Sequence, residues 1–209
     1  MENEDAHLAR DPVLERLIAD YGGPLPLDHD PAGAERPADL YGALLRAITG
    51  QQLSVKAARA IYGRLLARFD GRPPTPQELL DDDPDALRTA AGLSHAKVRS
   101  LRSLAEHVLA GELELDRLAE LDDREVAREL TAVKGIGQWT ADMFLMFTLH
   151  RPDVVAVGDQ GIRNAVMRAY GLTARPTADE LMALAEPWRP YRTRACLYLW
   201  RSLDSRPAV

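Results

Sequence analysis

The chain has 209 residues, 46% of them hydrophobic, with a formal net charge of −6, and this length predicts one globular domain or two closely packed ones. Its single cysteine, Cys196, excludes an internal disulfide framework, a four-cysteine zinc site and a cysteine-ligated iron–sulfur cluster, and we expect it to pack in the core. No apolar run approaches the roughly 20 residues that span a bilayer, and the acidic start MENEDAHLARD is unlike a secretory signal, so we expect a cytoplasmic protein.

The charge is unevenly distributed along the chain. Residues 1–40 contain ten acidic and three basic residues, about −7, which leaves about +1 for the remainder. Arginine outnumbers lysine 23 to 3, a bias that suits phosphate binding but that a GC-rich coding sequence also produces. The net negative charge therefore argues against a protein that binds nucleic acid simply by being basic, but it is compatible with a locally positive face on the remainder of the chain.

Helix start signals recur along the chain, whereas alternating strand patterns do not. The predicted starts in chain order are Asp11-Pro12, Leu40, Ser54, Thr75-Pro76, Asp83-Pro84, Ser94, Asp116, Asp122, Trp139, Ile162 and Thr177. Thr75, Asp122 and Thr177 each precede a glutamate by three residues, which is the spacing of a capping box. The helix after Ser54 is expected to turn Ala58, Ile61, Leu65 and Phe69 inward. About ten helices and no hairpins predict an all-α fold.

Two glycines, Gly135 and Gly137, interrupt the pattern between helical residues 124–131 and 139–149. Glycine permits positive φ and close backbone approach, so the segment predicts a tight hairpin between two helices, with Ile136 pointing inward. The second helix begins with outward N–H groups, which form an anion site suited to a phosphodiester. A plain helix-to-helix turn with a glycine cap is the alternative.

Longer strings carry a resemblance to a known family. VKGIGQWTADMFLMF, followed by VVAVGDQGIRNAV, resembles the helix-hairpin-helix DNA glycosylase superfamily, and within it the 3-methyladenine DNA glycosylase II branch. LLRAITGQQLSVKAARAIYGRL resembles the segment that places a residue into the duplex, and PWRPYRTRACLYLW resembles the C-terminal helix of that branch. Together these strings are distributed over most of the span from residue 38 to residue 203, in the expected order.

The resemblance implies a two-lobed helical bundle with the active site in the cleft between its lobes. It implies a glycosylase fold over residues 38–209, preceded by an N-terminal helix and loop extension, 1–37, that packs on it. Within the fold we expect a middle helical lobe at about 38–130, the helix-hairpin-helix at 123–149 and C-terminal helices at 159–203.

Asp159, in the string VGDQGIR, stands where the family has its catalytic aspartate. Rupture of the glycosidic bond leaves positive charge on the sugar, and an ionised carboxylate stabilises such a transition state and can orient the attacking water. On local grounds alone, Asp159 is also a good N-cap for the helix that follows it, and both roles can coexist at a helix start.

By the same resemblance, four residues line a base pocket. Trp139 stands where lyase members carry a lysine nucleophile, which indicates a monofunctional enzyme. Trp139 and Trp200 can each offer an aromatic face to a cationic purine, although core packing is the alternative for both. Met143 forms a soft pocket wall and Gln51 borders the pocket.

The DNA-binding residues implied by the resemblance are Gln52, which fills the space left by the flipped nucleotide, and the hairpin group Lys134, Gly135, Ile136, Gly137 and Thr140. The position of the inserted residue is defined to within one residue. The five histidines show no ligand spacing, so we expect no catalytic metal and no cofactor. The family hairpin can hold a monovalent cation through carbonyls, here those of Lys134 to Gly137.

The function implied is a monofunctional DNA glycosylase of base excision repair. It would excise 3-methyladenine, 7-methylguanine and related alkylated bases from double-stranded DNA and leave an abasic site, acting as a monomer at the nucleoid, away from membranes. A non-catalytic helix-hairpin-helix protein that recognises DNA structure is the alternative. A lyase of the oxidised-base branches is disfavoured by Trp139 and by the missing cluster cysteines. Activity on 1-methyladenine, 3-methylcytosine, ethenoadenine or hypoxanthine, DNA affinity and the role of residues 1–37 stay open.

Overall fold

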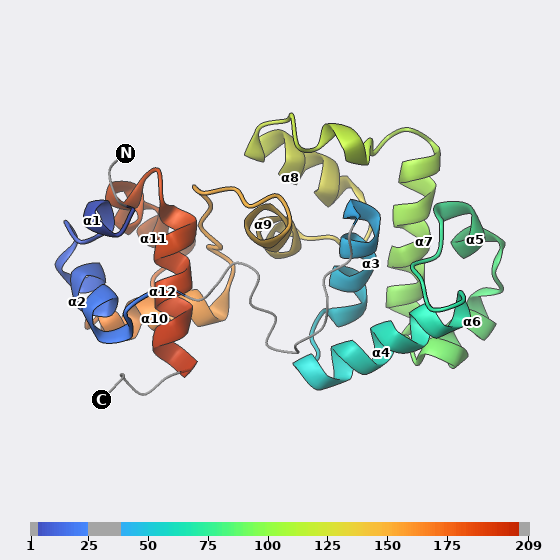
Figure 1. Cartoon of the computed structure of the whole chain (residues 1–209), viewed down its shortest axis with the longest axis horizontal. Helices are drawn as coiled ribbons and strands as arrows, with labels where there is room; N and C mark the ends of the chain where they lie inside the picture. Colours follow the sequence, from blue (N-terminus) through green and yellow to red (C-terminus); the bar gives the residue numbers. More distant parts are fainter. Residues whose placement is uncertain (1–3, 25–38, 205–209) are drawn as a thin grey trace. The chain divides into compact units, whose positions relative to one another are not determined.

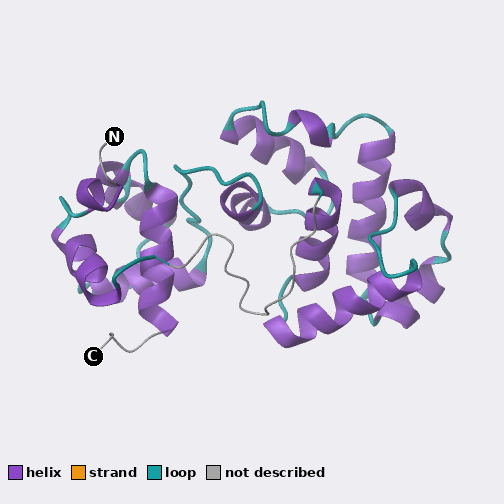
Figure 2. Cartoon of the chain, viewed as in Figure 1, coloured by secondary structure: helices purple, strands orange, loops and turns teal. Residues whose placement is uncertain are grey.

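The structure is a computed structural model that describes residues 4–24 and 39–204, and over these ranges it contains helices and loops but no strand (Figure 2). The helices are α1 (Glu4–Leu8), α2 (Pro12–Tyr21), α3 (Leu40–Gly50), α4 (Val55–Arg68), α5 (Pro76–Asp81), α6 (Pro84–Ala91), α7 (His95–Leu109), the 3₁₀-helix η1 (Leu115–Arg117), α8 (Asp123–Ala132), α9 (Gln138–Phe147), α10 (Gln160–Ala169), α11 (Ala178–Leu184), the 3₁₀-helix η2 (Glu186–Trp188) and α12 (Arg192–Asp204). The all-α fold class is confirmed. The described part has more helices than the ten or so predicted, and α1 is not among the predicted ones.

The helix starts follow the capping signals in the sequence. The Thr75 hydroxyl accepts the N–H of Glu78, and the Glu78 carboxylate accepts the N–H of Thr75, which is the predicted capping box. The same reciprocal pair forms between Asp122 and Glu125 and between Thr177 and Glu180. Single side-chain caps are confirmed at Asp11, Ser54, Asp83 and Ser94. These caps satisfy N–H groups that have no partner within their own helix.

The described helices form two compact units, each with its own core. One unit contains α1, α2, α10, α11, η2 and α12, in which α12 packs against α2 and α10 (Figure 1). Cys196 and Tyr198 of α12 are fully buried there, so the expected core position of the cysteine is confirmed. The first helices of the chain and its last helices therefore share one core.

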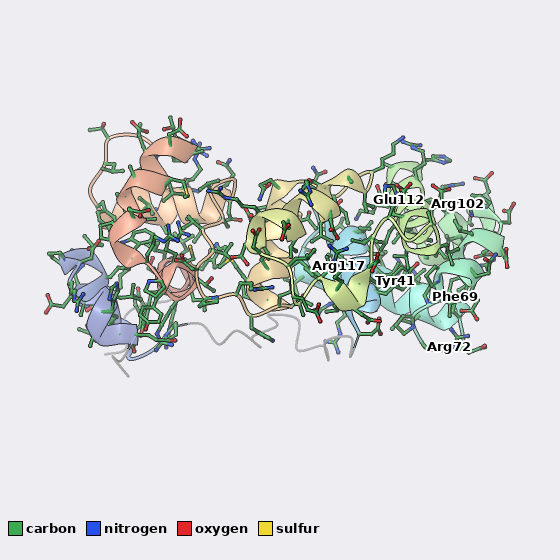
Figure 3. The ribbon with its side chains drawn as sticks, turned by 90° about the horizontal axis from the view of Figure 1, so that it is seen from above. Tyr41, Phe69, Arg72, Arg102, Glu112 and Arg117 are labelled. Carbon is green, nitrogen blue, oxygen red and sulfur yellow. The ribbon has the colours of Figure 1, made fainter. Side chains whose placement is uncertain are left out.

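The other unit contains α3 to α8, η1 and α9 as far as Phe144. Its longest helix, α7, packs against α5, α3 and α6 (Figure 1). Arg102 of α7, labelled in Figure 3, donates from Nη1 to the carbonyl oxygens of Leu79, Leu80 and Asp82 at the end of α5. None of the helices in the described part of the chain has the length and apolar character that crossing a membrane requires.

The inward face predicted for α4 is only partly correct. Leu65 is fully buried, but Ala58, Ile61 and Phe69 are half-buried. The reason is that α4 packs mainly against α3 and α6, which cover only part of its surface.

Candidate active site and DNA-contacting segments

Asp159 lies at the start of α10 and its carboxylate is half-buried. Its Oδ1 accepts the backbone N–H of Ile162 at 2.8 Å, so the predicted N-cap is confirmed. The same oxygen accepts the indole N–H of Trp200, from α12, at 2.9 Å. Two donors from different helices thus fix the orientation of the carboxylate. Asp159 caps α10 and nevertheless stays only half-buried.

The packing around Asp159 explains a glycine that sequence reasoning passed over. A Cβ atom at Gly161 would lie 2.9 Å from Asp159 Oδ1 and 3.2 Å from Trp200 Nε1, so a side chain would push against the carboxylate–indole pair. Trp200 itself is half-buried and packs on Phe147, with ring centroids 5.9 Å apart at an interplanar angle of 33°. The structure therefore assembles Asp159, Gly161 and Trp200 as one cluster within the first unit.

Trp139 and Met143 lie one turn apart on α9. Trp139 is 42% exposed, which excludes core packing as the reason for this tryptophan, and Met143 is half-buried. Trp139, Met143 and Gln51 lie in the unit of α3 to α9, whereas Asp159 and Trp200 lie in the unit of α10 and α12. Their role as pocket residues stays a prediction.

The hairpin between α8 and α9 forms as predicted, and its two glycines differ. Gly135 has φ +88°, and a Cβ there would come within 2.0 Å of Ser100 Oγ on α7. Ile136 is 4% exposed, which confirms its inward position. Neither a positive φ nor a close contact accounts for Gly137 within the described part of the chain, because its φ is not positive and a Cβ there would meet none of the described atoms within 4 Å.

The turn between α3 and α4 exposes the predicted inserted residue. Gln52 is exposed and adopts φ +57°, a left-handed conformation that glycine would favour. The next residue, Leu53, is 39% exposed, and Val55 at the start of α4 is 43% exposed. An exposed turn with apolar side chains beside it is the kind of feature that minor-groove proteins press between base steps.

Gln51 and Thr140, predicted at the base pocket and at the DNA, contact each other. The side-chain amide of Gln51 donates from Nε2 to the Gly135 carbonyl at 2.9 Å and to Thr140 Oγ1 at 3.1 Å. Thr140 is only 4% exposed, so its hydroxyl is occupied inside the protein. The amide of Gln51 is thus committed to the hairpin.

One buried carboxyl, Asp142 on α9, was not singled out by the sequence. It is 4% exposed, Gln138 Nε2 donates to its Oδ1 at 2.8 Å, and its Oδ2 has no hydrogen-bond partner among the described residues. Burial raises the pKa of Asp142 to about 6, while the bond from Gln138 works in the opposite direction. An aspartate in an otherwise apolar helical face gives no sequence signal that distinguishes it from an exposed one.

Groups of three or more His, Cys, Asp or Glu side chains that could hold a metal ion do not occur among the described residues. Of the hairpin carbonyls predicted to hold a monovalent cation, that of Gly135 accepts the Gln51 amide and that of Gly137 accepts the N–H of Ala141.

Comparison with known proteins identifies the family. Residues 45–190 match the model of the HhH-GPD superfamily base excision DNA repair proteins. DNA-3-methyladenine glycosylase 1 of Schizosaccharomyces pombe is 40% identical over 164 residues, which are 78% of this chain and 72% of that protein. A putative DNA-3-methyladenine glycosylase of Bacillus subtilis is 31% identical over 201 residues, 91% of this chain and 66% of that protein.

A solved structure agrees with these matches. The S. pombe 3-methyladenine DNA glycosylase in complex with abasic DNA has a TM-score of 0.80 to this chain at 32% identity, with 99% of this chain and 98% of that one covered. The resemblance seen in the hairpin and in the string around Asp159 thus extends over the whole fold. This chain belongs to the HhH-GPD superfamily of base excision DNA repair proteins.

Proposed function

We propose that this chain is a DNA glycosylase that flips alkylated bases out of double-stranded DNA and hydrolyses their N-glycosidic bonds. Its substrates would be 3-methyladenine, 7-methylguanine and related lesions. The proposal rests mainly on the geometry of Asp159, whose half-buried carboxylate is held in one orientation by the Ile162 N–H and the Trp200 indole N–H. Relatives named as DNA-3-methyladenine glycosylases support the substrate class.

The chemistry needs little from the protein beyond one negative charge. Alkylation of a ring nitrogen gives the base a positive charge, so when the C1′–N bond breaks, the base takes the electron pair and leaves neutral. The sugar is left as an oxocarbenium-like cation, which the ionised carboxylate of Asp159 stabilises. Water then adds to C1′ and loses a proton, for which Asp159 is the acceptor at hand, and an abasic site remains.

Trp200 and Trp139 contribute in different ways. Trp200 positions Asp159, because its indole N–H donates to the carboxylate. Trp139 is exposed and offers its face to the flipped cationic base, an interaction worth about 0.5–2 kcal/mol. Met143, one turn further along α9, supplies an adaptable wall to the same pocket.

The hairpin binds the phosphate backbone. A Cβ at Gly137 would meet none of the described atoms within 4 Å. Its missing side chain therefore leaves room for a phosphate to approach the N-terminus of α9 from outside the protein. Lys134 is exposed beside it and adds charge. A monovalent cation at the hairpin would use carbonyls from Lys134 to Gly137, of which those of Gly135 and Gly137 each also accept one protein N–H group. Such an ion would bridge protein and phosphate.

The enzyme is monofunctional in this proposal and acts as a monomer. A lyase needs an amine that attacks C1′ and forms a Schiff base, and Trp139 at the corresponding place has none. Lys134 belongs to the hairpin that binds phosphate. Borohydride therefore traps no covalent complex, and strand scission after base release requires added alkali.

The test uses duplexes that each carry one defined lesion. The purified protein is expected to release 3-methyladenine and to leave an alkali-labile site at the lesion position only. Binding to the same duplexes without base release, at an affinity that ignores damage, would overturn the proposal in favour of a protein that recognises DNA structure. A borohydride-trapped complex would overturn the monofunctional assignment alone.

A further inference from the structure

Gln51 joins two segments that lie far apart in the sequence. Its Nε2 donates to the carbonyl of Gly135 at 2.9 Å and to Thr140 Oγ1 at 3.1 Å, 84 and 89 residues further along the chain. Gly135 lies in the hairpin, and Thr140 lies in the first turn of α9. Gln51 immediately precedes Gln52, the exposed residue at the tip of the α3–α4 turn.

The residues around this contact are fixed as well. Lys97 of α7 donates from Nζ to the carbonyl of Thr49 at 2.6 Å, which fixes the end of α3 next to the turn. The N–H of Lys134 donates to Ser103 Oγ at 3.2 Å, and Gly135 packs directly on Ser100. The three residues of α7, Lys97, Ser100 and Ser103, are spaced by three and so lie along one row of the helix. Helix α7 thus supports the turn at one end of this row and the hairpin at the other, and Gln51 ties them directly.

The turn needs such support because its conformation is costly. Gln52 adopts φ +57°, a region sparsely populated by residues other than glycine, and it is exposed. Insertion into a base stack presses on this tip, since unstacking costs a few kcal/mol per step. A tip that yielded under this load would not hold the gap open. The load therefore has to be carried by the residues that anchor the turn.

We infer that Gln51 is a positioning residue that braces the Gln52–Leu53 tip against the hairpin, so that the inserted tip and the phosphate-binding loop meet the duplex at a fixed separation. This inference rests on the proposed function and deepens it. The brace acts when the base is being extracted, and it does not touch the base that is cut. Its contribution is therefore largest where the lesion is well stacked and paired, and smallest where it is already extruded.

The test compares Gln51→Leu with the parent protein in single-turnover excision from two duplexes. In one the lesion is paired in a regular duplex, and in the other it lies in a single-nucleotide bulge. The expected result is a rate loss of about 10-fold to 100-fold on the paired lesion, as for removal of bonds worth about 1.5–3 kcal/mol, and less than about threefold on the bulge. Gln51→Glu, whose carboxylate cannot donate to the Gly135 carbonyl, is the second variant and should show the same contrast.

Gln77→Leu is the matched control. Gln77 is exposed and also donates a side-chain amide hydrogen bond, but to Asp81 within its own helix α5, so both rates should equal those of the parent. Equal losses on the two duplexes would overturn the brace, because a general folding defect ignores base pairing. A rate loss in Gln51→Leu that changed with the chemical identity of the lesion, and not with its pairing, would overturn the brace as well, since Gln51 would then contact the base.

Fluorescence separates a failed brace from a failed function. Duplexes carrying an uncleavable abasic analogue beside 2-aminopurine report unstacking by the inserted tip without any excision. The parent should raise the fluorescence, and Gln51→Leu should reduce this rise at saturating protein. If the parent excises no lesion, the proposed function fails, but the fluorescence rise still decides whether Gln51 braces the tip. A rise in Gln51→Leu and Gln51→Glu equal to that of the parent would overturn the brace.

Discussion

The half-buried Trp200 orients the carboxylate of Asp159, because its indole N–H donates a hydrogen bond to it. An oxygen that receives both a backbone N–H and an indole N–H cannot rotate away from the helix start without losing both bonds. Gly161 keeps the space that this arrangement needs. In an enzyme that stabilises a cationic sugar, a carboxylate of fixed orientation avoids the reorganisation that a mobile one would undergo.

Trp200→Phe keeps an aromatic ring against Phe147 but removes the donor to Asp159. We expect single-turnover excision to slow by about 10-fold to 100-fold, as for loss of one hydrogen bond to a charged group, with duplex affinity nearly unchanged. The matched control is Trp188→Phe, which removes an indole donor to Asp11 in the same unit. That control should lower thermal stability and leave the rate intact; equal rates in both variants would remove the positioning role of Trp200.

Asp142 makes a second residue-scale prediction, through pH. The pKa of Asp142 is raised by burial to about 6 from an ordinary value of 3.8, so the unfolded chain gives up this proton first as pH rises. The buried carboxyl therefore costs stability progressively between about pH 4 and pH 6, and the full cost persists above that range. Asp142→Asn stays neutral throughout. In urea titrations, its unfolding free energy relative to the parent should rise by about 1–3 kcal/mol between about pH 4 and pH 7.5. A constant difference across that range would show that Asp142 is not buried.

At the scale of elements, the helices of this fold are predictable because their signals are local. A capping box such as Thr75 with Glu78 lies within four residues, and proline or an N-cap aspartate marks the same helix turn that it stabilises. The hairpin is predictable for the same reason. The difference between its glycines is not, because Ser100, which excludes a side chain at Gly135, is 35 positions away and carries no signal of that contact.

The two hairpin glycines form a matched pair of substitutions. Gly135→Ala should destabilise the protein by about 2 kcal/mol or more, because Cβ would collide with Ser100 and φ is +88°. Gly137→Ala should cost less, under about 1 kcal/mol, since its φ is not positive and its surroundings among the described residues are open, although alanine is the poorer N-cap of α9. Duplex affinity should fall for both. Urea denaturation and DNA titrations measure the two effects, and full affinity in a well-folded Gly137→Ala would remove the hairpin from the DNA contact.

At the scale of the whole molecule, the acidic start of the chain has a structural use that its sequence does not reveal. Asp5 forms a two-bond ion pair with Arg194 of α12, which lowers the pKa of Asp5, and it also accepts the Tyr198 hydroxyl. Asp11 Oδ2 accepts the Tyr170 hydroxyl at 2.5 Å and the Trp188 indole at 3.1 Å. These partners lie at least 159 positions away, so no local pattern could pair them. The same is true of Gln51 and the hairpin.

Asp11→Asn tests this attachment of the first helices. Although burial alone would raise it, the pKa of Asp11 is lowered by hydrogen bonds from Tyr170, Trp188 and the start of α2. The amide keeps one acceptor for the helix cap but replaces Oδ2 by an NH₂ donor that faces the Trp188 indole, which can only donate, so we expect the free energy of unfolding to fall by about 1–3 kcal/mol. Asp83→Asn, at an exposed cap of α6 that accepts the N–H of Ala86, should change stability by less than about 0.5 kcal/mol. Equal losses in the two variants would mean that the contacts of Asp11 Oδ2 contribute nothing.

The catalytic claim for this molecule rests on the charge of one side chain, and Asp159→Asn tests it most directly. Asparagine caps a helix as well as aspartate does, so α10 and the fold should be kept, and Asp122→Asn, the same change at the start of α8, is the control for capping alone. We predict that Asp159→Asn binds a duplex carrying an abasic analogue as tightly as the parent and releases 3-methyladenine at least about 100-fold more slowly in single turnover. Release at the parental rate by the folded variant would contradict the account.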